Sequence, residues 1–115
     1  MPMQTLPPGK WQHYLQRISE RYAGQLVTLR QQEHARDEAH VILWRTPLRR
    51  LSADADAEGA EVVVAGGYEE PFIEIAISPV QRIAVSLSAE QTLERMQIRS
   101  QDGKLATLLF NLEGY

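Results

Sequence analysis

The sequence contains no cysteine, which excludes disulfide bonds, thiolate catalysis, zinc–thiolate sites and iron–sulfur clusters. It has no apolar run close to the roughly 18 residues that a membrane-spanning helix needs. The first residues lack both the basic region and the apolar region of an export signal. We therefore expect a cytoplasmic protein without a membrane segment.

A surplus of basic charge is also missing, since 12 lysines and arginines stand against 15 aspartates and glutamates, a formal net charge of −3. Because proteins that coat DNA are usually strongly basic, this balance argues against such a role but leaves room for a local basic patch. The 115 residues match one domain of ordinary size, and a hydrophobic content of 43% is typical of a chain that buries its own core. We therefore expect residues 1–115 to form a single domain.

A short amphipathic helix is the clearest predicted element. One apolar stripe with helical spacing is formed by Trp11, Tyr14, Leu15, Ile18 and Tyr22. The two prolines before residue 9 and the glycine at position 24 limit the helix at its two ends. The pattern predicts an N-terminal segment over 1–9, a helix over 10–23 and a β-rich part over 25–115.

The β-rich part consists of short segments in which apolar and polar residues alternate or β-branched residues gather. They predict strands near 26–30, 48–52, 61–65, 73–77, 83–88, 95–100 and 105–110. Residues 41–44 form a further apolar run, and Pro47 is expected to break whatever element precedes it. We expect residues 31–40 to form a short exposed helix or a mobile connection, and residues 53–60 to form an acidic turn. The predicted fold class is α+β, with one N-terminal helix packed on a mostly antiparallel sheet of about six strands that is curled or forms a partly open barrel.

The last two segments are expected to pair as a hairpin around Asp102-Gly103, because this dipeptide favours a two-residue turn. The predicted register places Ile98 opposite Thr107 and Met96 opposite Leu109. The core-facing side would then carry Met96, Ile98, Leu105 and Leu109, and the other side would set Arg95, Gln97 and Arg99 opposite Phe110, Leu108 and Ala106. Since the final strand is apolar on both sides, we expect both faces to be covered, either by closure of the sheet or by a second copy or partner.

The sequence shows no arrangement of residues that is typical of an enzyme. Donor side chains without a metal-binding motif gather in the polar stretch 31–40, namely Glu33, His34, Asp37, Glu38 and His40. Residues 54–59 reproduce only the first half of a calcium loop, whose twelfth position is Ala65. No serine lies in a nucleophile-elbow context, and no glycine-rich phosphate loop occurs. We therefore assign no catalytic, cofactor-binding or metal-binding residue.

The leading functional hypothesis is a non-enzymatic binding or protein-interaction module, in which an uncovered sheet face serves self-association as a homodimer or a protein partner. The candidate interaction residues are Trp44, Leu108, Phe110, Arg95 and Arg99. One alternative is a small-ligand carrier or an enzyme whose pocket lies in the mouth of the curled sheet. Another is weak binding of single-stranded nucleic acid through Arg95 and Arg99, on the same strand face.

The chain resembles a small family of uncharacterised bacterial proteins, a domain of unknown function. The resemblance rests on Leu6-Pro7-x-x-x-Trp11-x-x-Tyr14 at the helix start and on Gly24-x-x-Val27-Thr28-Leu29 after it. Later markers are Pro47-Leu48 before a strand that ends near Asp54, Pro79 followed by Ile83 and Val85, and Asp102-Gly103 in the last hairpin. The resemblance spans nearly the whole chain and implies a one-domain cytoplasmic bacterial protein. It implies no activity and no catalytic residue.

Overall fold

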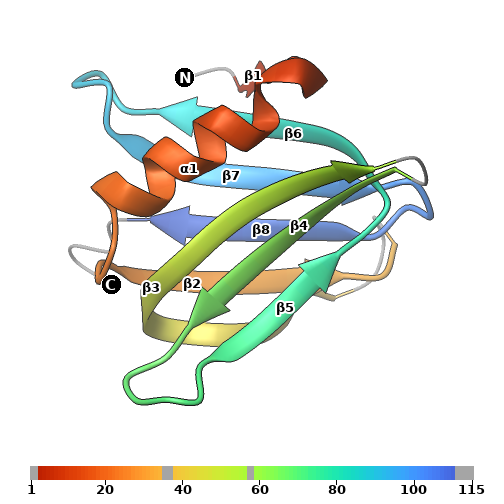
Figure 1. Cartoon of the computed structure of the whole chain (residues 1–115). Coiled ribbons are helices and arrows are strands. Elements are labelled where there is room, and N and C mark those ends of the chain that lie inside the picture. Colours follow the sequence, from red (N-terminus) through yellow and green to blue (C-terminus); the bar gives the residue numbers. More distant parts are fainter. Residues whose placement is uncertain (1–2, 35–37, 57–58, 111–115) are drawn as a thin grey trace.

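The computed structural model describes residues 3–34, 38–56 and 59–110, and it contains one α-helix and eight strands (Figure 1). The elements in chain order are β1 (Gln4–Thr5), the 3-10 turn η1 (Pro8–Lys10), α1 (Trp11–Arg21), β2 (Leu26–Gln32), β3 (His40–Asp56), β4 (Gly59–Gly66), β5 (Ile73–Ile77), β6 (Val80–Leu87), β7 (Leu93–Ser100) and β8 (Leu105–Phe110). The predicted α+β class and the N-terminal helix are therefore confirmed.

All strand pairs are antiparallel, and they form one sheet in the order β1-β6-β7-β8-β2-β3-β4-β5. The sheet has eight strands rather than about six, and it does not close, because β1 and β5 lie at its two ends. The additional strand β1 is only two residues long and pairs with β6. It lies in the segment 1–9, which has no alternating pattern that would have revealed it.

The long strand β3 divides the sheet into two layers. Its first half pairs with β2, and its second half pairs with β4. Figure 1 shows that the second half of β3, together with β4 and β5, crosses in front of the layer formed by β6, β7, β8 and β2. The helix α1 lies beside β3 over the same face, and the N–H of Leu51 donates to Ser19 Oγ at 3.1 Å. The core therefore lies between the larger layer and a cover made of α1 and the second layer.

The expected break at Pro47 is wrong, since β3 continues through this proline. The N–H of Leu48 donates to Gln25 O at 2.9 Å on the β2 side. Successive backbone groups of a strand point to opposite sides, so the nitrogen of Pro47 points away from β2. On that side β3 pairs with β4, and this pairing begins only at Leu48. Proline therefore removes no ladder hydrogen bond there.

The predicted helical stripe is confirmed. Trp11, Leu15, Ile18 and Tyr22 are buried and Tyr14 is half-buried. The α-helix itself is shorter than the predicted 10–23, because the turn η1 precedes it and Gly24 with φ of 84° follows it. Only glycine adopts this left-handed conformation at little cost, which ends the helix and lets β2 start two residues later.

The connections around β3 also differ from the predictions. No helix occurs in the described part of 31–40, because β2 extends to Gln32 and β3 begins at His40, with residues 35–37 outside the described part. Strands β3 and β4 also continue into the predicted turn 53–60, up to the pair Asp56 and Gly59. The turn itself lies outside the described residues.

The register of the last hairpin differs from the prediction by one residue. Met96 pairs with Leu108 and Ile98 with Ala106, while the N–H of Ser100 donates to Lys104 O at 2.9 Å. The loop is thus residues 101–103, with Gly103 alone at positive φ, 95°. Three-residue hairpin loops of this kind place a single left-handed residue at the third position, whereas the predicted turn needs two.

This single-residue shift exchanges the two faces of β8, because side chains alternate along a strand. Leu108 and Phe110 are buried in the core, with exposed fractions of 0% and 2%, and the ring of Phe110 lies 5.4 Å from that of Tyr22. Leu105 and Leu109, which were predicted to face the core, lie on the opposite face and are half-buried.

Candidate functional site

The face of the larger layer that points away from α1 and β5 is the candidate site, and we call it the outer face. Its residues alternate along each strand with the core residues. They are Arg82, Ala84 and Ser86 of β6, Arg95, Gln97 and Arg99 of β7, Leu105, Thr107 and Leu109 of β8, Thr28 and Arg30 of β2, and Val41 and Trp44 of β3.

The strand register brings two arginines of the outer face directly opposite each other. Arg82 of β6 pairs with Arg99 of β7. Arg99 in turn pairs with Leu105 of β8. Like charges in directly opposite positions of an antiparallel pair destabilise a sheet. The repulsion between Arg82 and Arg99 therefore lowers the stability of the sheet at this position.

A third arginine, Arg95, lies on the same strand face as Arg99 and pairs with Ser86 on one side and Leu109 on the other. Its Nε is buried and has no hydrogen-bond partner among the described residues. A buried donor without a partner costs free energy, because the hydrogen bond it made with water in the unfolded chain is not replaced. The fourth arginine, Arg30, pairs with Thr107 and Val41.

Among the outer-face residues that pair across neighbouring strands, none is an aspartate or a glutamate. The only acidic residue of β2, β6, β7 and β8 is Glu94, which is exposed at a register irregularity between the core residue Leu93 and the outer-face residue Arg95. Within the described ranges, the ion pairs are those of Arg50 with Glu74 and of Lys104 with Glu33 and Asp102, so none involves an arginine of the outer face. The outer face therefore has an excess of basic over acidic residues, with Glu94 beside Arg95 as the nearest acidic residue along these strands.

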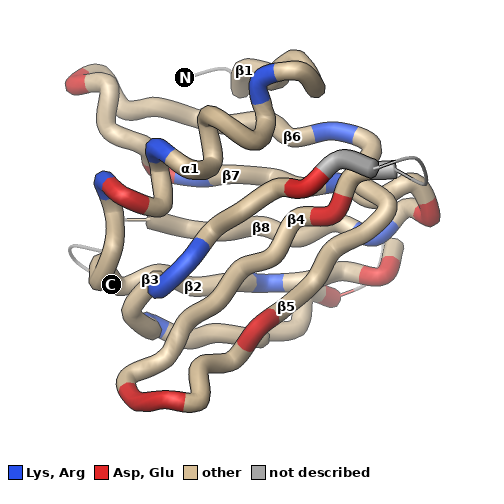
Figure 2. Tube along the Cα trace, in the orientation of Figure 1, with Lys and Arg blue, Asp and Glu red and all other residues tan. Residues whose placement is uncertain are grey.

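Acidic and basic residues occur in both described layers, since the second layer also carries Arg49 and Arg50 of β3 and the larger layer carries Glu94 of β7. Although the net charge is −3, Figure 2 shows acidic positions along β4 and β5 and in loops, while β6 and β2 carry basic positions. On the second layer, Glu61 belongs to β4 and Glu74 to β5. A negative net charge therefore coexists with a positive outer face.

Apolar surface accompanies the arginines on the outer face. The side chain of Trp44 is 65% exposed and that of Val41 is 51% exposed. Trp44 precedes Arg45, whose N–H donates to Thr28 Oγ1 at 3.2 Å, so β3 is held against β2 at this point. Tryptophan and arginine are the residue types that most often dominate the binding energy of protein interfaces.

The structure brings together three of the five residues that the sequence predicted as interaction candidates. Trp44, Arg95 and Arg99 lie on the outer face. Leu108 and Phe110 lie in the core and are closed to a partner, because the true register turns them inward. Sequence reasoning missed Arg30 and Arg82. The alternation of Arg82, Ala84 and Ser86 with Ile83 and Val85 was a signal for Arg82, but its pairing with Arg99 was not visible.

The two stretches of the sequence that gather possible metal ligands, 31–40 and 54–59, are only partly described, since residues 35–37 and 57–58 lie outside the described ranges. Among the residues that the structure describes, no group of three histidines, aspartates or glutamates is placed to hold a metal ion. Glu33 instead lies 3.8 Å from Lys104 Nζ, and Asp37 is outside the described residues. The only α-helix in the described ranges, α1, is too short and too polar to cross a bilayer.

Comparisons of the chain with family models, with curated proteins and with solved structures found no match. The resemblance to a bacterial family of unknown function therefore stays a prediction.

Proposed function

We propose that this protein is a binding module whose outer face docks an acidic, partly apolar segment of a partner protein. The observation that carries the proposal is the set of four arginines on this face, which have no acidic cross-strand partner, form no ion pair within the described part of the chain and include the opposed pair Arg82 and Arg99. A partner with carboxylates would neutralise these charges and offset the cost that they impose on the free protein.

The composition of the face favours a protein partner over single-stranded nucleic acid. Proteins that bind single strands stack successive bases on several aromatic side chains that lie among the basic residues. Trp44 is the only aromatic residue at the outer-face positions, and it lies at the margin on β3, away from Arg82 and Arg99 on β6 and β7. The positions nearest to Arg95 and Arg99 are instead Leu109 and Leu105. Leucines next to arginines suit a peptide that alternates apolar and acidic side chains.

The same charges argue against a homodimer through the outer face. A two-fold dimer apposes the same surface patch of both copies, so the arginines of one copy would meet those of the other. In addition, the apolar residues Leu108 and Phe110, which suggested self-association, are already covered within one chain. We therefore assign the face to a different protein, and the proposal keeps the bacterial cytoplasm as the compartment.

The test is a selection of displayed random peptides on the immobilised protein, in parallel with the variants Arg99→Glu and Lys10→Glu. Both variants change the charge by the same amount, but Lys10 is an exposed residue at the end of η1, outside the strands that form the outer face. We expect the wild type and Lys10→Glu to enrich acidic peptides with leucine or aromatic residues, and Arg99→Glu to lose them.

Three outcomes would overturn the proposal. The first is no enrichment of acidic peptides, and the second is equal enrichment by Arg99→Glu. The third is salt-sensitive binding of oligothymidylate that Arg99→Glu abolishes, which would assign the face to nucleic acid. Sedimentation of the wild type at micromolar concentration checks the homodimer, and a dimer that Arg99→Glu dissociates would also contradict the proposal.

A further inference from the structure

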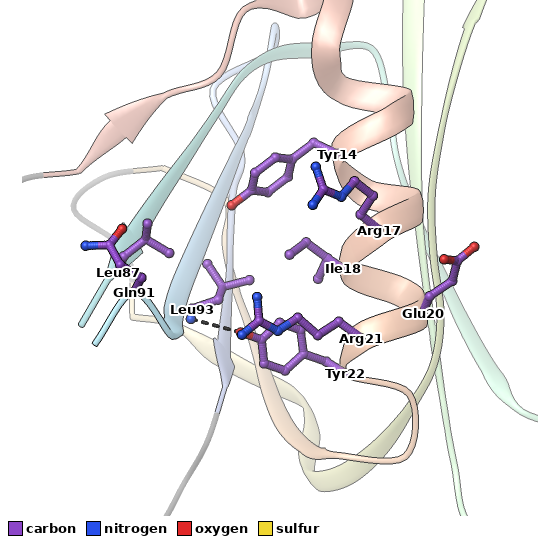
Figure 3. Close-up of a pocket in the computed structure, with 9 residues that line it drawn as sticks. All are labelled: Tyr14, Arg17, Ile18, Glu20, Arg21, Tyr22, Leu87, Gln91 and Leu93. Carbon is purple, nitrogen blue, oxygen red and sulfur yellow. Dashed lines mark hydrogen bonds between the residues drawn. The ribbon is translucent and has the colours of Figure 1, made fainter. Parts of the chain in front are cut away.

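A second candidate site lies apart from the outer face, where α1 passes over the ends of β6 and β7. It is a pocket of about 490 Å³ (Figure 3). The last turns of α1 form one wall, and Leu87, Gln91 and Leu93 form the other. Pockets that bury small molecules usually have volumes of about 300–1,000 Å³, so this space suits a small ligand.

One wall of the pocket carries two arginines and one glutamate, a surplus of positive charge. Arg17 and Arg21 are one helical turn apart, and Figure 3 shows both guanidinium groups directed from α1 toward β6 and β7. Neither forms an ion pair within the described part of the chain. Glu20 also lines the pocket, and Figure 3 shows its carboxylate on the other side of α1 from the two guanidinium groups. Like charges four residues apart weaken a helix, so this pair has a cost in the free protein.

The floor of the pocket is apolar and rigid. Ile18 and Leu93 are buried and Leu87 is half-buried. The N–H of Leu93 donates to Tyr22 Oη at 3.1 Å, which ties the start of β7 to the end of the helix. The Arg21 guanidinium carbon lies 5.6 Å from the centre of the Tyr22 ring, so the positive charge is held over an aromatic face. An apolar ligand body would therefore meet a preformed surface.

A neutral hydrogen-bond donor completes the site. The hydroxyl of Tyr14 points into the pocket in Figure 3, and it forms no hydrogen bond with another described residue. Burial raises the pKa of this phenol above 10.0, a nearby Tyr22 raises it further, and Arg17 acts in the opposite direction. The hydroxyl therefore keeps its proton at neutral pH and is free to donate a hydrogen bond to an anion.

We propose that this pocket binds an amphiphilic carboxylate, a molecule with one carboxylate group and an apolar chain or ring. The carboxylate lies between Arg17 and Arg21 and accepts a hydrogen bond from the Tyr14 hydroxyl, while the apolar body lies on Leu87 and Leu93. Charge-assisted hydrogen bonds to arginine favour the planar carboxylate. This site is independent of the outer face, so either proposal stands if the other fails.

The larger hollow beside β4 and β5, about 670 Å³, does not have this character. Its lining contains two arginines, Arg49 and Arg50, and two glutamates, Glu70 and Glu74, and Arg50 pairs with Glu74. Basic and acidic residues are therefore equal in number there. The pocket at α1 instead combines a surplus of positive charge with a free donor and an apolar floor.

Binding is tested by calorimetry and by NMR titration with decanoate below its micelle-forming concentration, and with 2-naphthoate as a ring-shaped carboxylate. Decanol and inorganic phosphate are the matched probes that each lack one half of the proposed ligand. We expect at least one carboxylate to bind and to shift resonances of α1 and of 87–93, and we expect decanol and phosphate to bind at least about tenfold more weakly.

The variant Arg17→Gln/Arg21→Gln should weaken carboxylate binding by at least about tenfold, because charged hydrogen bonds are lost. Tyr14→Phe should weaken it by about 2- to 10-fold through the loss of one neutral donor. Arg30→Gln on the outer face is the control and should leave the affinity unchanged. All these side chains are at least partly exposed, so circular dichroism should show the native fold in each variant.

The proposal is overturned if neither carboxylate binds, or if Arg17→Gln/Arg21→Gln binds as tightly as the wild type. Equal binding of decanol would reduce the site to an apolar groove, and equal binding of phosphate would reduce it to an anion site. Both results contradict the assignment of an amphiphilic carboxylate.

Discussion

Arg82 and Arg99 lie directly opposite each other on neighbouring strands, on a face where no cross-strand partner is acidic. Cross-strand pairs are the unit of sheet stabilisation, and a pair of like charges is among the unfavourable ones. A sequence that specifies its fold usually avoids such local conflicts, and the exceptions tend to mark functional sites. The pair lowers the stability of the free protein, and this cost is the reason why we take the pair as a sign of a binding site.

The substitution Arg99→Glu should make the protein more stable while it removes partner binding. It turns the like-charge pair with Arg82 into an opposite-charge pair, and we expect the free energy of unfolding to rise by about 0.5–1 kcal/mol at low salt. Urea denaturation measures the change. The gain should shrink in high salt, since both side chains reach solvent. Arg99→Lys, which keeps the charge, is the control, and a loss of stability in Arg99→Glu would contradict the pairing argument.

The register of the last hairpin predicts opposite outcomes for two neighbouring leucines. Leu108→Ala should lower the free energy of unfolding by about 2–5 kcal/mol, because it leaves a cavity in the core. Leu109→Ala should cost much less, since Leu109 is half-buried on the outer face. Chemical denaturation of the two variants compares them directly. A larger loss of stability in Leu109→Ala than in Leu108→Ala would contradict the observed register and support the one predicted from the sequence.

The loop residue Gly103 should tolerate alanine poorly. Its φ of 95° is a conformation that residues with a side chain rarely adopt, and we expect Gly103→Ala to cost about 1–2 kcal/mol of stability. Gly9→Ala is a suitable control, because Gly9 has no positive φ and open space surrounds the position of an added Cβ. Thermal unfolding of both variants provides the comparison, and equal melting temperatures would show that the loop does not need glycine.

Asp102 should contribute stability that depends on pH. Its carboxylate accepts hydrogen bonds from Ser100 Oγ and from the N–H of Lys104, and these bonds, the one from Ser100 first, lower its pKa from the ordinary 3.8. The contribution is present above the ordinary pKa and is lost as the pH falls through the lowered, folded-state pKa.

The stability difference between the wild type and Asp102→Asn should therefore be constant near neutral pH and disappear in strong acid. Denaturation curves over an acidic pH series measure it. Since a hydrogen bond is the main cause, the difference should persist in high salt. A difference that does not change with pH would show that the charge of Asp102 plays no part.

Much of the local structure was predictable from the chain itself. The helical stripe from Trp11 to Tyr22 identified the buried face of α1, because a period near 3.6 leaves few alternatives. Most strands lie where alternation placed them, including β5, β7 and β8. The exceptions have specific causes: β1 is two residues long, and Pro47 sits on a side of β3 where its missing donor is not needed.

The candidate sites were only partly predictable. Arg95, Arg99 and Trp44 were singled out from their sequence neighbourhood, and they do share one face. Their relation to Arg82 and Arg30 depends on which strands are neighbours, and β2 and β8 are far apart in the chain but adjacent in the sheet. The pocket at α1 was not foreseen, because Arg17 and Arg21 read as ordinary solvent-facing residues of an amphipathic helix.

The sequence by itself determined the type and the place of α1 and of most strands, because hydrophobic periodicity is a local property of a few neighbouring residues. The tertiary structure alone decided which leucines of β8 face the core, and how β3 bends so that β4 and β5 join α1 as a cover. The reason is that a shift of one residue in a strand pairing reverses every side chain while leaving the alternation unchanged. Only the packing of β8 against segments that are distant in the sequence distinguishes the two registers.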